Sequence, residues 1–131
     1  MCCKPVPCHV HGLTHTCDGC SYHKRTQADS SVEATYGATF VPKLDDLLTA
    51  ADFVVLACPC NAETEGMIGA HELAVMGPET YLVNVGRGKL VNTDAVVAAL
   101  HDRIIAGYAT DGTLAAALGC FGAASCIRVP P

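Results

Sequence analysis

Apolar residues fall into short blocks along this 131-residue chain, and polar segments with a different periodicity separate the blocks. Continuous apolar runs predict buried strands at residues 53–58, 81–84 and 104–110, because strands of a parallel sheet are covered on both faces. Short strands are also predicted at 21–26 and, as an edge strand, at 38–41. The alternation of strands with helical segments indicates an α/β fold with a parallel, doubly wound sheet.

Helical periodicity appears between these strands. Leu44, Leu47, Leu48 and Ala51 follow the spacing of one helix face, which predicts a helix at this point. A short helix is predicted at 70–76, and another after a cap at Asn92 or Thr93, with Val96, Val97 and Leu100 toward the sheet. Residues 27–37 are polar, and we interpret them as a loop.

Three segments of different character divide the chain. Residues 1–20 hold five cysteines and three histidines with hardly any apolar periodicity, and we call them the Cys/His-rich segment. Residues 21–112 carry the α/β pattern. Residues 113–131 form a small-residue-rich tail, for which a ragged helix is one interpretation.

The stretch YLVNVGRGKLVNTD, residues 81–94, is the strongest candidate for chemistry. Arg87 stands between two glycines directly after a predicted strand, which places it at the carboxyl end, where open α/β sheets bind ligands. Glycines on both sides would let the backbone turn sharply. A guanidinium there can hold a carboxylate through two parallel hydrogen bonds. The alternative is a surface arginine in a tight turn.

Cysteine and histidine side chains suggest a second kind of site. The Cys/His-rich segment offers these zinc-ligand candidates: Cys8, His9, His11, His15, Cys17 and Cys20. The Cys17–Cys20 spacing is that of a zinc knuckle, but no second pair matches it, so we expect a disordered segment without a defined metal site. Cys58 and Cys60 are interpreted as thiols in the core.

Charge and hydropathy exclude two classes of partner. A net charge of −5 and a pI near 5.5 disfavour nucleic acid, whose phosphates require a basic face. No apolar run reaches the ~18 residues that span a bilayer, because Asp52 interrupts the best candidate. The first residues lack the apolar core of a signal peptide, so a cytoplasmic location is expected.

Residues 21–112 resemble the D-isomer-specific 2-hydroxyacid dehydrogenases. The resemblance rests on VNVGRGKLVNTDAVVAAL, on the preceding LDDLLTAADFVVLACPCNAETEGMIGAHELAVMGP and on IIAGYATDG at 104–112. Tyr22 to Thr26 resembles the second-strand end of NADP-preferring members, especially the glyoxylate/hydroxypyruvate reductases of plants. This family implies a Rossmann-like fold and hydride transfer between a nicotinamide and a small 2-keto or 2-hydroxy acid.

The resemblance also implies roles for individual residues. Arg87 would be catalytic, holding the substrate carboxylate. Arg25 would meet the ribose 2′-phosphate of NADP, an anion that suits its planar fork, although NAD remains an alternative. The remaining residues implied to contact the cofactor are Thr26, Cys58, Pro59, Val85, Gly86 and Asp111.

Two features of the family pattern have no counterpart in this sequence. In a sheet of order 3-2-1-4-5-6 the first strand lies in the middle and carries the glycine-rich loop, and this chain offers only strands two to six. No glutamate or histidine follows Asp111. We therefore expect unpaired inner strand edges and a truncated form with little activity of its own. Alternatives are a non-catalytic nucleotide-binding or interaction module, paired with itself or with a full-length relative, and a small zinc protein.

Overall fold

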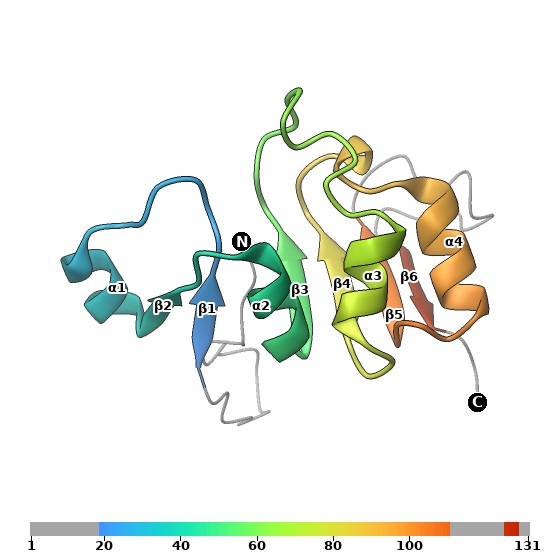
Figure 1. The fold of residues 1–131 in the computed structure, drawn as a ribbon, viewed down its shortest axis with the longest axis horizontal. Helices are drawn as coiled ribbons and strands as arrows, with labels where there is room; N and C mark the ends of the chain where they lie inside the picture. The colour runs from blue at the N-terminus through green and yellow to red at the C-terminus, as the bar shows by residue number, and fades with distance from the viewer. Residues whose placement is uncertain (1–18, 111–124, 129–131) are drawn as a thin grey trace.

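The structure is a computed structural model that describes residues 19–110 and the backbone of residues 125–128 (Figure 1). Its strands are β1 (Cys20–Tyr22), β2 (Ala38–Phe40), β3 (Phe53–Leu56), β4 (Tyr81–Asn84), β5 (Gly107–Thr110) and β6 (Ser125–Arg128). Its helices are α1 (Ser30–Tyr36), α2 (Leu44–Ala50), α3 (Ala70–Met76), α4 (Thr93–His101) and the 3₁₀ turn η1 (Gly88–Leu90).

The strands form two sheets. β1 and β2 pair in parallel, and the other sheet has the order β3-β4-β5-β6, with β6 antiparallel to β5. Strands β3, β4 and β5 are parallel, as predicted. Within the described residues no strand joins β1 to β3, and the expected gap in the sheet stays a prediction for the chain as a whole.

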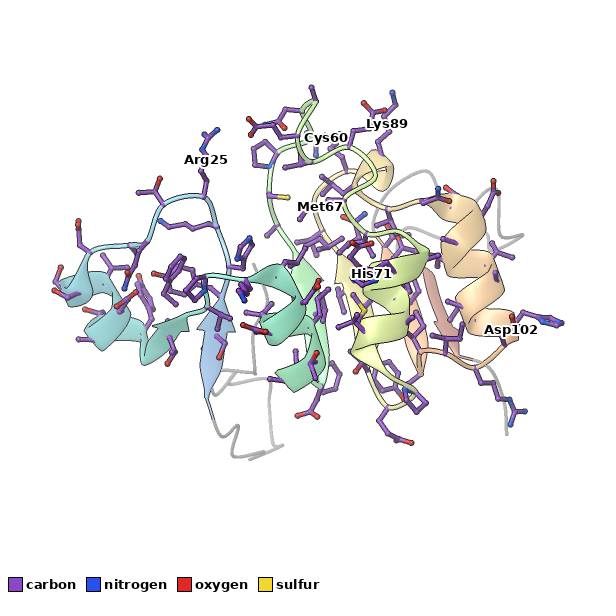
Figure 2. All side chains as sticks on the ribbon, viewed as in Figure 1. Arg25, Cys60, Met67, His71, Lys89 and Asp102 are labelled. Atoms are coloured by element: carbon purple, nitrogen blue, oxygen red, sulfur yellow. The ribbon has the colours of Figure 1, made fainter. Side chains whose placement is uncertain are left out.

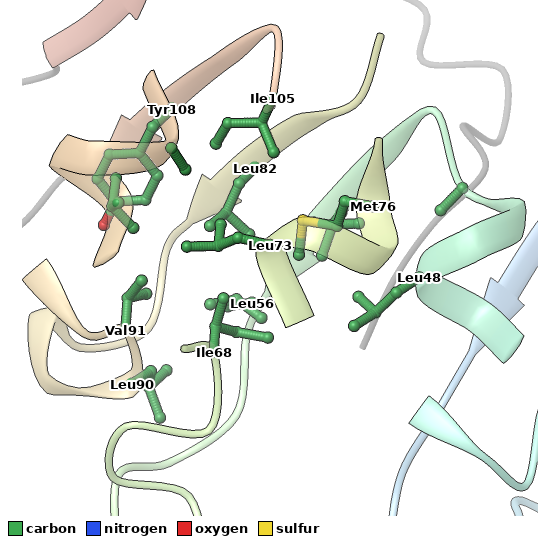
Figure 3. Close-up of a cluster of buried hydrophobic side chains, with 14 of the residues drawn as sticks. Leu48, Leu56, Ile68, Leu73, Met76, Leu82, Leu90, Val91, Ile105 and Tyr108 are labelled. Atoms are coloured by element: carbon green, nitrogen blue, oxygen red, sulfur yellow. The ribbon is translucent and has the colours of Figure 1, made fainter. Parts of the chain in front are cut away.

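Helices α2, α3 and α4 lie on one face of the four-stranded sheet (Figure 1). Alternate strand residues point toward them, because side chains alternate between the two faces of a strand. Val54, Leu56, Leu82 and Tyr108 on this side are almost completely buried. Figure 3 shows several of them packed with Leu73 and other residues of the core. This packing fixes the ends of β3 and β4 relative to each other.

The predicted loop at 27–37 was wrong, because residues 30–36 form helix α1. The helix buries none of its residues, and Val32 and Tyr36 are exposed. A helix without a buried face shows no apolar periodicity, which is the signal on which the prediction depended. Its end is nevertheless marked in the sequence, since Gly37 adopts the left-handed conformation and donates its N–H to Glu33 O.

Other predictions failed at boundaries and faces. The strands predicted at 21–26, 53–58 and 104–110 are shorter, because their last or first residues turn into loops. Val97 is 42% exposed rather than directed to the sheet, and Ala99 is buried in its place. Residues 125–128 are a strand, so the ragged-helix interpretation was wrong for that part of the tail.

Among the described residues, no helix is sufficiently long and apolar to cross a bilayer.

Candidate functional site

A cleft of about 960 Å³ opens at the carboxyl ends of β3 and β4. Two segments line it. The loop after β3 contributes residues 57–62 and Glu65, and the turn after β4 contributes residues 85–89. Figure 2 shows Cys60 and Lys89 at this end of the molecule, with Arg25 on the loop after β1 at the same end. The carboxyl ends of parallel strands are where α/β sheets bind ligands.

Asn84, the last residue of β4, shapes the turn that carries Arg87. Its side chain is buried, with Oδ1 accepting the Gly86 N–H at 3.0 Å and Nδ2 donating to Arg87 O at 2.9 Å. A buried amide needs such partners, because an unpaired polar group in the core is costly. The amide therefore holds the backbone on both sides of Gly86. In the sequence Asn84 is recognisable only as a strand residue, so this function was not predicted.

Gly86 and Gly88 differ in the space available for a side chain. A Cβ on Gly86 would lie 2.7 Å from Leu90 Cδ1 and 2.9 Å from Cys58 O, whereas a Cβ on Gly88 would meet nothing within 4 Å. Neither residue has a positive φ. The predicted need for backbone freedom on both sides of Arg87 was therefore wrong. Gly86 is required because the turn approaches the β3 loop closely.

Backbone hydrogen bonds tie the loop after β3 to the turn after β4. The Gly66 N–H donates to Lys89 O at 2.8 Å, the Ile68 N–H donates to Leu90 O at 3.1 Å, and the Asn92 N–H donates to Ile68 O at 2.9 Å. These three bonds join the two segments that carry the walls of the cleft. The walls are consequently one hydrogen-bonded unit.

Charged side chains cluster around the cleft. Arg87 is exposed and donates to Gly86 O at 3.0 Å, and Lys89 pairs with Glu65 at 3.3 Å. Arg25 pairs with Glu63 at 3.2 Å, although the two side chains remain 84% and 72% exposed. The Arg25–Glu63 pair links the loop after β1 to the loop after β3. Two cations, Arg87 and Lys89, thus line the cleft and can meet an anionic ligand.

The structure brings five of the predicted site residues together around this cleft. They are Cys58, Pro59, Val85, Gly86 and Arg87. Arg25 and Thr26 are exposed on the loop after β1 and are not part of the cleft wall. Asp111 lies outside the described residues. The roles of all eight stay predictions.

Sequence reasoning missed further residues of the cleft. They are Ala57, Cys60, Asn61, Ala62, Glu65, Gly88 and Lys89. Asn61 caps its own turn by accepting the N–H groups of Glu63 and Thr64 with Oδ1. An asparagine shortly after a proline is a recognisable turn signal, and it could have indicated this wall.

The described part of the chain contains no group of three or more His, Cys, Asp or Glu side chains that could hold a metal ion. The zinc-ligand candidates other than Cys20 lie outside the described residues. Cys58 and Cys60 are partly buried free thiols packed against the core, and the Cys58 Sγ lies 3.8 Å from the Met67 Sδ.

Part of the cleft wall has the chemical character that a nicotinamide ring would need. Val85 is 49% exposed and, with Pro59, gives the wall an apolar surface suited to a flat ring. Gly86, also in the wall, lies so close to Leu90 and the Cys58 carbonyl that it has no room for a side chain. The pyrophosphate of a dinucleotide is typically bound by a G-x-G-x-x-G turn before a helix, and the lining of the cleft contains no such turn. The cleft wall is therefore suited to the nicotinamide ring with its carboxamide group and to a carboxylate beside the ring.

Comparison with known proteins identifies several relatives. Glyoxylate reductase from Thermococcus onnurineus is 47% identical over 90 residues, which are 69% of this chain and 26% of that protein. Mitochondrial formate dehydrogenase from Solanum tuberosum is 38% identical over 90 residues, covering 69% of this chain and 24% of the relative. The chain thus spans about a quarter of the length of these relatives.

Solved structures agree with the sequence comparison. The NADPH-dependent glyoxylate/hydroxypyruvate reductase of Sinorhizobium meliloti, solved with NADP and malonate, is 35% identical with a TM-score of 0.64. It matches 70% of this chain and 27% of its own. A D-isomer specific 2-hydroxyacid dehydrogenase from Lactobacillus delbrueckii ssp. bulgaricus, complexed with NAD, is also 35% identical with a TM-score of 0.65 over 70% of this chain and 27% of its own. Together they confirm the predicted Rossmann-like fold and a nicotinamide cofactor for this type of domain.

The family assignment rests on most of the chain. Residues 17–117 match the family described as D-isomer specific 2-hydroxyacid dehydrogenase, NAD binding domain. The family match and the relatives agree with the observed parallel sheet. The chain therefore belongs to the D-isomer specific 2-hydroxyacid dehydrogenase family and corresponds to its NAD-binding domain.

Proposed function

We propose that this chain binds a nicotinamide nucleotide, NADP in preference to NAD, and holds a small 2-keto acid by its carboxylate. The reaction served would be that of a glyoxylate/hydroxypyruvate reductase, in which a 2-keto acid becomes a D-2-hydroxy acid. A reduced nicotinamide supplies the hydride for such a reaction when it is bound.

The observation that carries this proposal is the position of Arg87. Its guanidinium is exposed on the cleft wall, held there by a turn that Asn84 fixes from below. Arginine remains charged at physiological pH and offers two parallel N–H donors to a carboxylate. The same donors can polarise the adjacent carbonyl, which favours the developing negative charge on its oxygen.

The other predicted contacts would hold the nucleotide. Val85 and Pro59 would pack against the nicotinamide ring, with Cys58 and Gly86 forming the floor. Arg25 and Thr26 are on the loop after β1. Figure 2 shows Arg25 at the same end of the molecule as Cys60 and Lys89. A basic residue there suits the 2′-phosphate that distinguishes NADP from NAD.

Binding measurements on the purified chain test the proposal directly. NADPH and NADH are titrated by calorimetry, and glyoxylate is then titrated into the NADPH complex. We expect tighter binding of NADPH, and Arg25→Asp should abolish or reverse that preference. Equal affinities for the two nucleotides before and after this change would refute the assignment to Arg25.

The carboxylate site is tested with a matched pair of variants. Arg87→Met should weaken glyoxylate binding by about tenfold or more, the effect of losing a charge-assisted hydrogen-bonded pair. Lys89→Met removes the other cation of the same cleft wall and should have a much smaller effect. A larger effect at Lys89 would show that the carboxylate is held by that residue instead.

A further inference from the structure

A closed loop connects β1 to α1. Residues 23–29 leave the strand after Tyr22 and lead to the first residue of the helix. Tyr22 is only 6% exposed, and its hydroxyl accepts the Ala28 N–H at 2.9 Å. The residue before the loop therefore binds the backbone near the end of the loop. Arg25 and Thr26 occupy the middle of the closed segment, and Figure 2 shows the Arg25 side chain extending outward from it.

A second hydrogen bond keeps the Tyr22 hydroxyl in this position. A tyrosine hydroxyl can donate one hydrogen bond while it accepts another. The hydroxyl donates to Glu33 Oε1 at 2.6 Å, and the same carboxylate oxygen accepts the side-chain amide of Gln27 at 3.0 Å. Glu33 belongs to α1, whereas Gln27 belongs to the loop. The loop is consequently attached at two consecutive residues, Gln27 and Ala28.

The aromatic ring of Tyr22 takes part in the same arrangement. Its centroid lies 5.4 Å from the centroid of the Phe40 ring on β2 and 5.9 Å from the Lys24 Nζ. The second distance is within the range of a cation–π contact, so Lys24 is directed toward the ring. Arg25 instead pairs with Glu63, and its side chain remains 84% exposed. The two neighbouring cations thus have different partners, and Arg25 remains accessible to a ligand.

We propose that Tyr22 is a positioning residue for cofactor choice, because its hydroxyl closes the loop and so holds Arg25 where the ribose 2′-phosphate of NADP would lie. This inference rests on the proposed function, which assigns Arg25 to that phosphate. A loop that is ordered before the ligand arrives loses less conformational entropy on binding. The affinity of a ligand falls with the fraction of the protein that has the binding conformation, so an open loop weakens NADPH binding. NADH lacks the phosphate and does not depend on the position of Arg25 in the same way.

Tyr22→Phe tests the proposal, because it keeps the ring and removes only the hydroxyl. Calorimetry on the 131-residue chain measures the affinities for NADPH and NADH. We expect NADPH affinity to fall by about two- to tenfold, the effect of losing a hydrogen bond that holds the loop, and NADH affinity to change by less than about twofold. The ratio of the two affinities is the readout, because a loss of folded protein lowers both affinities alike and leaves their ratio unchanged.

Phe40→Leu is the matched control. It removes the ring that packs against Tyr22 but leaves the hydroxyl and its two partners, Glu33 and Ala28, in the chain. If Tyr22 only stabilised the contact between β1 and β2, the two variants would change nucleotide binding in the same way. We expect Phe40→Leu to leave the ratio of NADPH to NADH affinity unchanged. Circular dichroism checks that both variants are folded.

Amide hydrogen exchange tests the closed loop without a nucleotide. The Ala28 N–H is followed, because it donates to the Tyr22 hydroxyl. We expect this amide to exchange at least about tenfold faster in Tyr22→Phe than in the unsubstituted chain, as for an amide that loses its partner and opens locally. An unchanged exchange rate would show that the hydroxyl does not close the loop. That result would overturn the proposal whatever the nucleotide affinities are.

The nucleotide measurements separate this inference from the proposed function. A preference for NADPH that disappears in Arg25→Asp but persists undiminished in Tyr22→Phe would overturn the inference alone. An equal loss of preference in Phe40→Leu would also overturn it, since the effect would then come from packing of the ring. No preference for NADPH in the unsubstituted chain would refute the role proposed for Arg25, and the inference would fall with it.

Discussion

At the scale of single residues, the contact between Arg25 and Glu63 bears on cofactor choice. Arg25 is the residue that we propose for the 2′-phosphate, yet its guanidinium already lies 3.2 Å from the Glu63 carboxylate. Both side chains are largely exposed, so the pair contributes about 0–1 kcal/mol. Glu63 therefore competes with the phosphate for the guanidinium without blocking it.

We predict that Glu63→Gln increases NADPH affinity by a factor of up to about five and leaves NADH affinity unchanged, because the free energy of an exposed pair is about 1 kcal/mol or less. Calorimetry at low salt measures both affinities, and the difference should shrink as salt screens the charges. Glu65→Gln is the control, since it removes the same charge from the same loop but faces Lys89. An equal gain from that variant would attribute the effect to net charge and contradict the role of Glu63.

Gly86 allows an equally specific prediction about packing. Gly86→Ala places a Cβ 2.7 Å from Leu90 Cδ1 and 2.9 Å from the Cys58 carbonyl, and the carbonyl cannot rotate away. The variant should lower the free energy of unfolding by about 1–3 kcal/mol, as overpacking does. Gly88→Ala meets nothing within 4 Å and should change stability little. Chemical denaturation of both variants provides the measurement, and equal destabilisation would show that the close approach is not what selects glycine.

At the scale of elements, α1 is attached to β1 by a polar contact rather than by an apolar face. Tyr22 is buried, and its hydroxyl donates to Glu33 Oε1 at 2.6 Å while accepting the Ala28 N–H at 2.9 Å. Gln27 also donates to the same carboxylate at 3.0 Å. The hydrogen bonds from Tyr22 and Gln27 hold the pKa of Glu33 below its usual value, and burial followed by the bond to Glu33 raises the pKa of Tyr22.

These shifts predict how stability depends on pH. A carboxyl group with a lowered pKa in the folded state stabilises the fold above its unfolded pKa, and this contribution disappears as pH falls through the folded value. The raised Tyr22 pKa contributes below pH 10, and that contribution is lost as pH rises through the folded value. In Tyr22→Phe both dependences should weaken, the acid one only in part because Gln27 remains. Denaturation between pH 3 and 11 measures them, and unchanged profiles would contradict the assignment.

The elements also show what the sequence could predict. The runs at 53–58 and 81–84 and the leucine spacing at 44–48 are dense apolar signals, and β3, β4 and α2 were found where they indicated. Helix α1 was not predicted because a hydrogen bond between Tyr22 and Glu33 produces no periodic pattern of apolar residues in the sequence. The same contrast applies to the candidate site. Arg87 could be predicted because its flanking glycines are visible in the sequence. Asn84 could not, because it acts through two hydrogen bonds that form only in the folded turn.

At the scale of the whole molecule, the described residues meet some of the requirements for keto-acid reduction and not others. The cleft offers an apolar wall at Val85 and a carboxylate-binding cation at Arg87. Such a reduction also requires a proton donor that is within hydrogen-bond reach of the substrate oxygen and titrates near the working pH. Histidine is the most common donor of this kind, and each of the three histidines within the described residues contacts a residue outside the cleft wall.

Each histidine contact lies outside the cleft wall. His23 Nδ1 is 2.9 Å from Val41 O, His71 pairs with Asp45 at 3.3 Å, and His101 pairs with Asp102 at 2.8 Å. Figure 2 shows His71 on α3 and Asp102 at the end of α4, on the helical side of the sheet. None of these three histidines therefore provides a proton donor in the described cleft.

We consequently predict that the 131-residue chain reduces glyoxylate or hydroxypyruvate with NADPH no faster than the background reaction. General acid catalysis contributes about 10²- to 10⁴-fold, and arginine cannot provide it because it does not release its proton at physiological pH. The rate is measured as the decrease of NADPH absorbance with time at saturating substrate. T. onnurineus glyoxylate reductase is the positive control. Turnover at the level of that enzyme, abolished by Arg87→Ala, would contradict the prediction. Such a result would place a proton donor in a part of the chain outside the described cleft, and histidine variants at positions 9, 11 and 15 would then locate it.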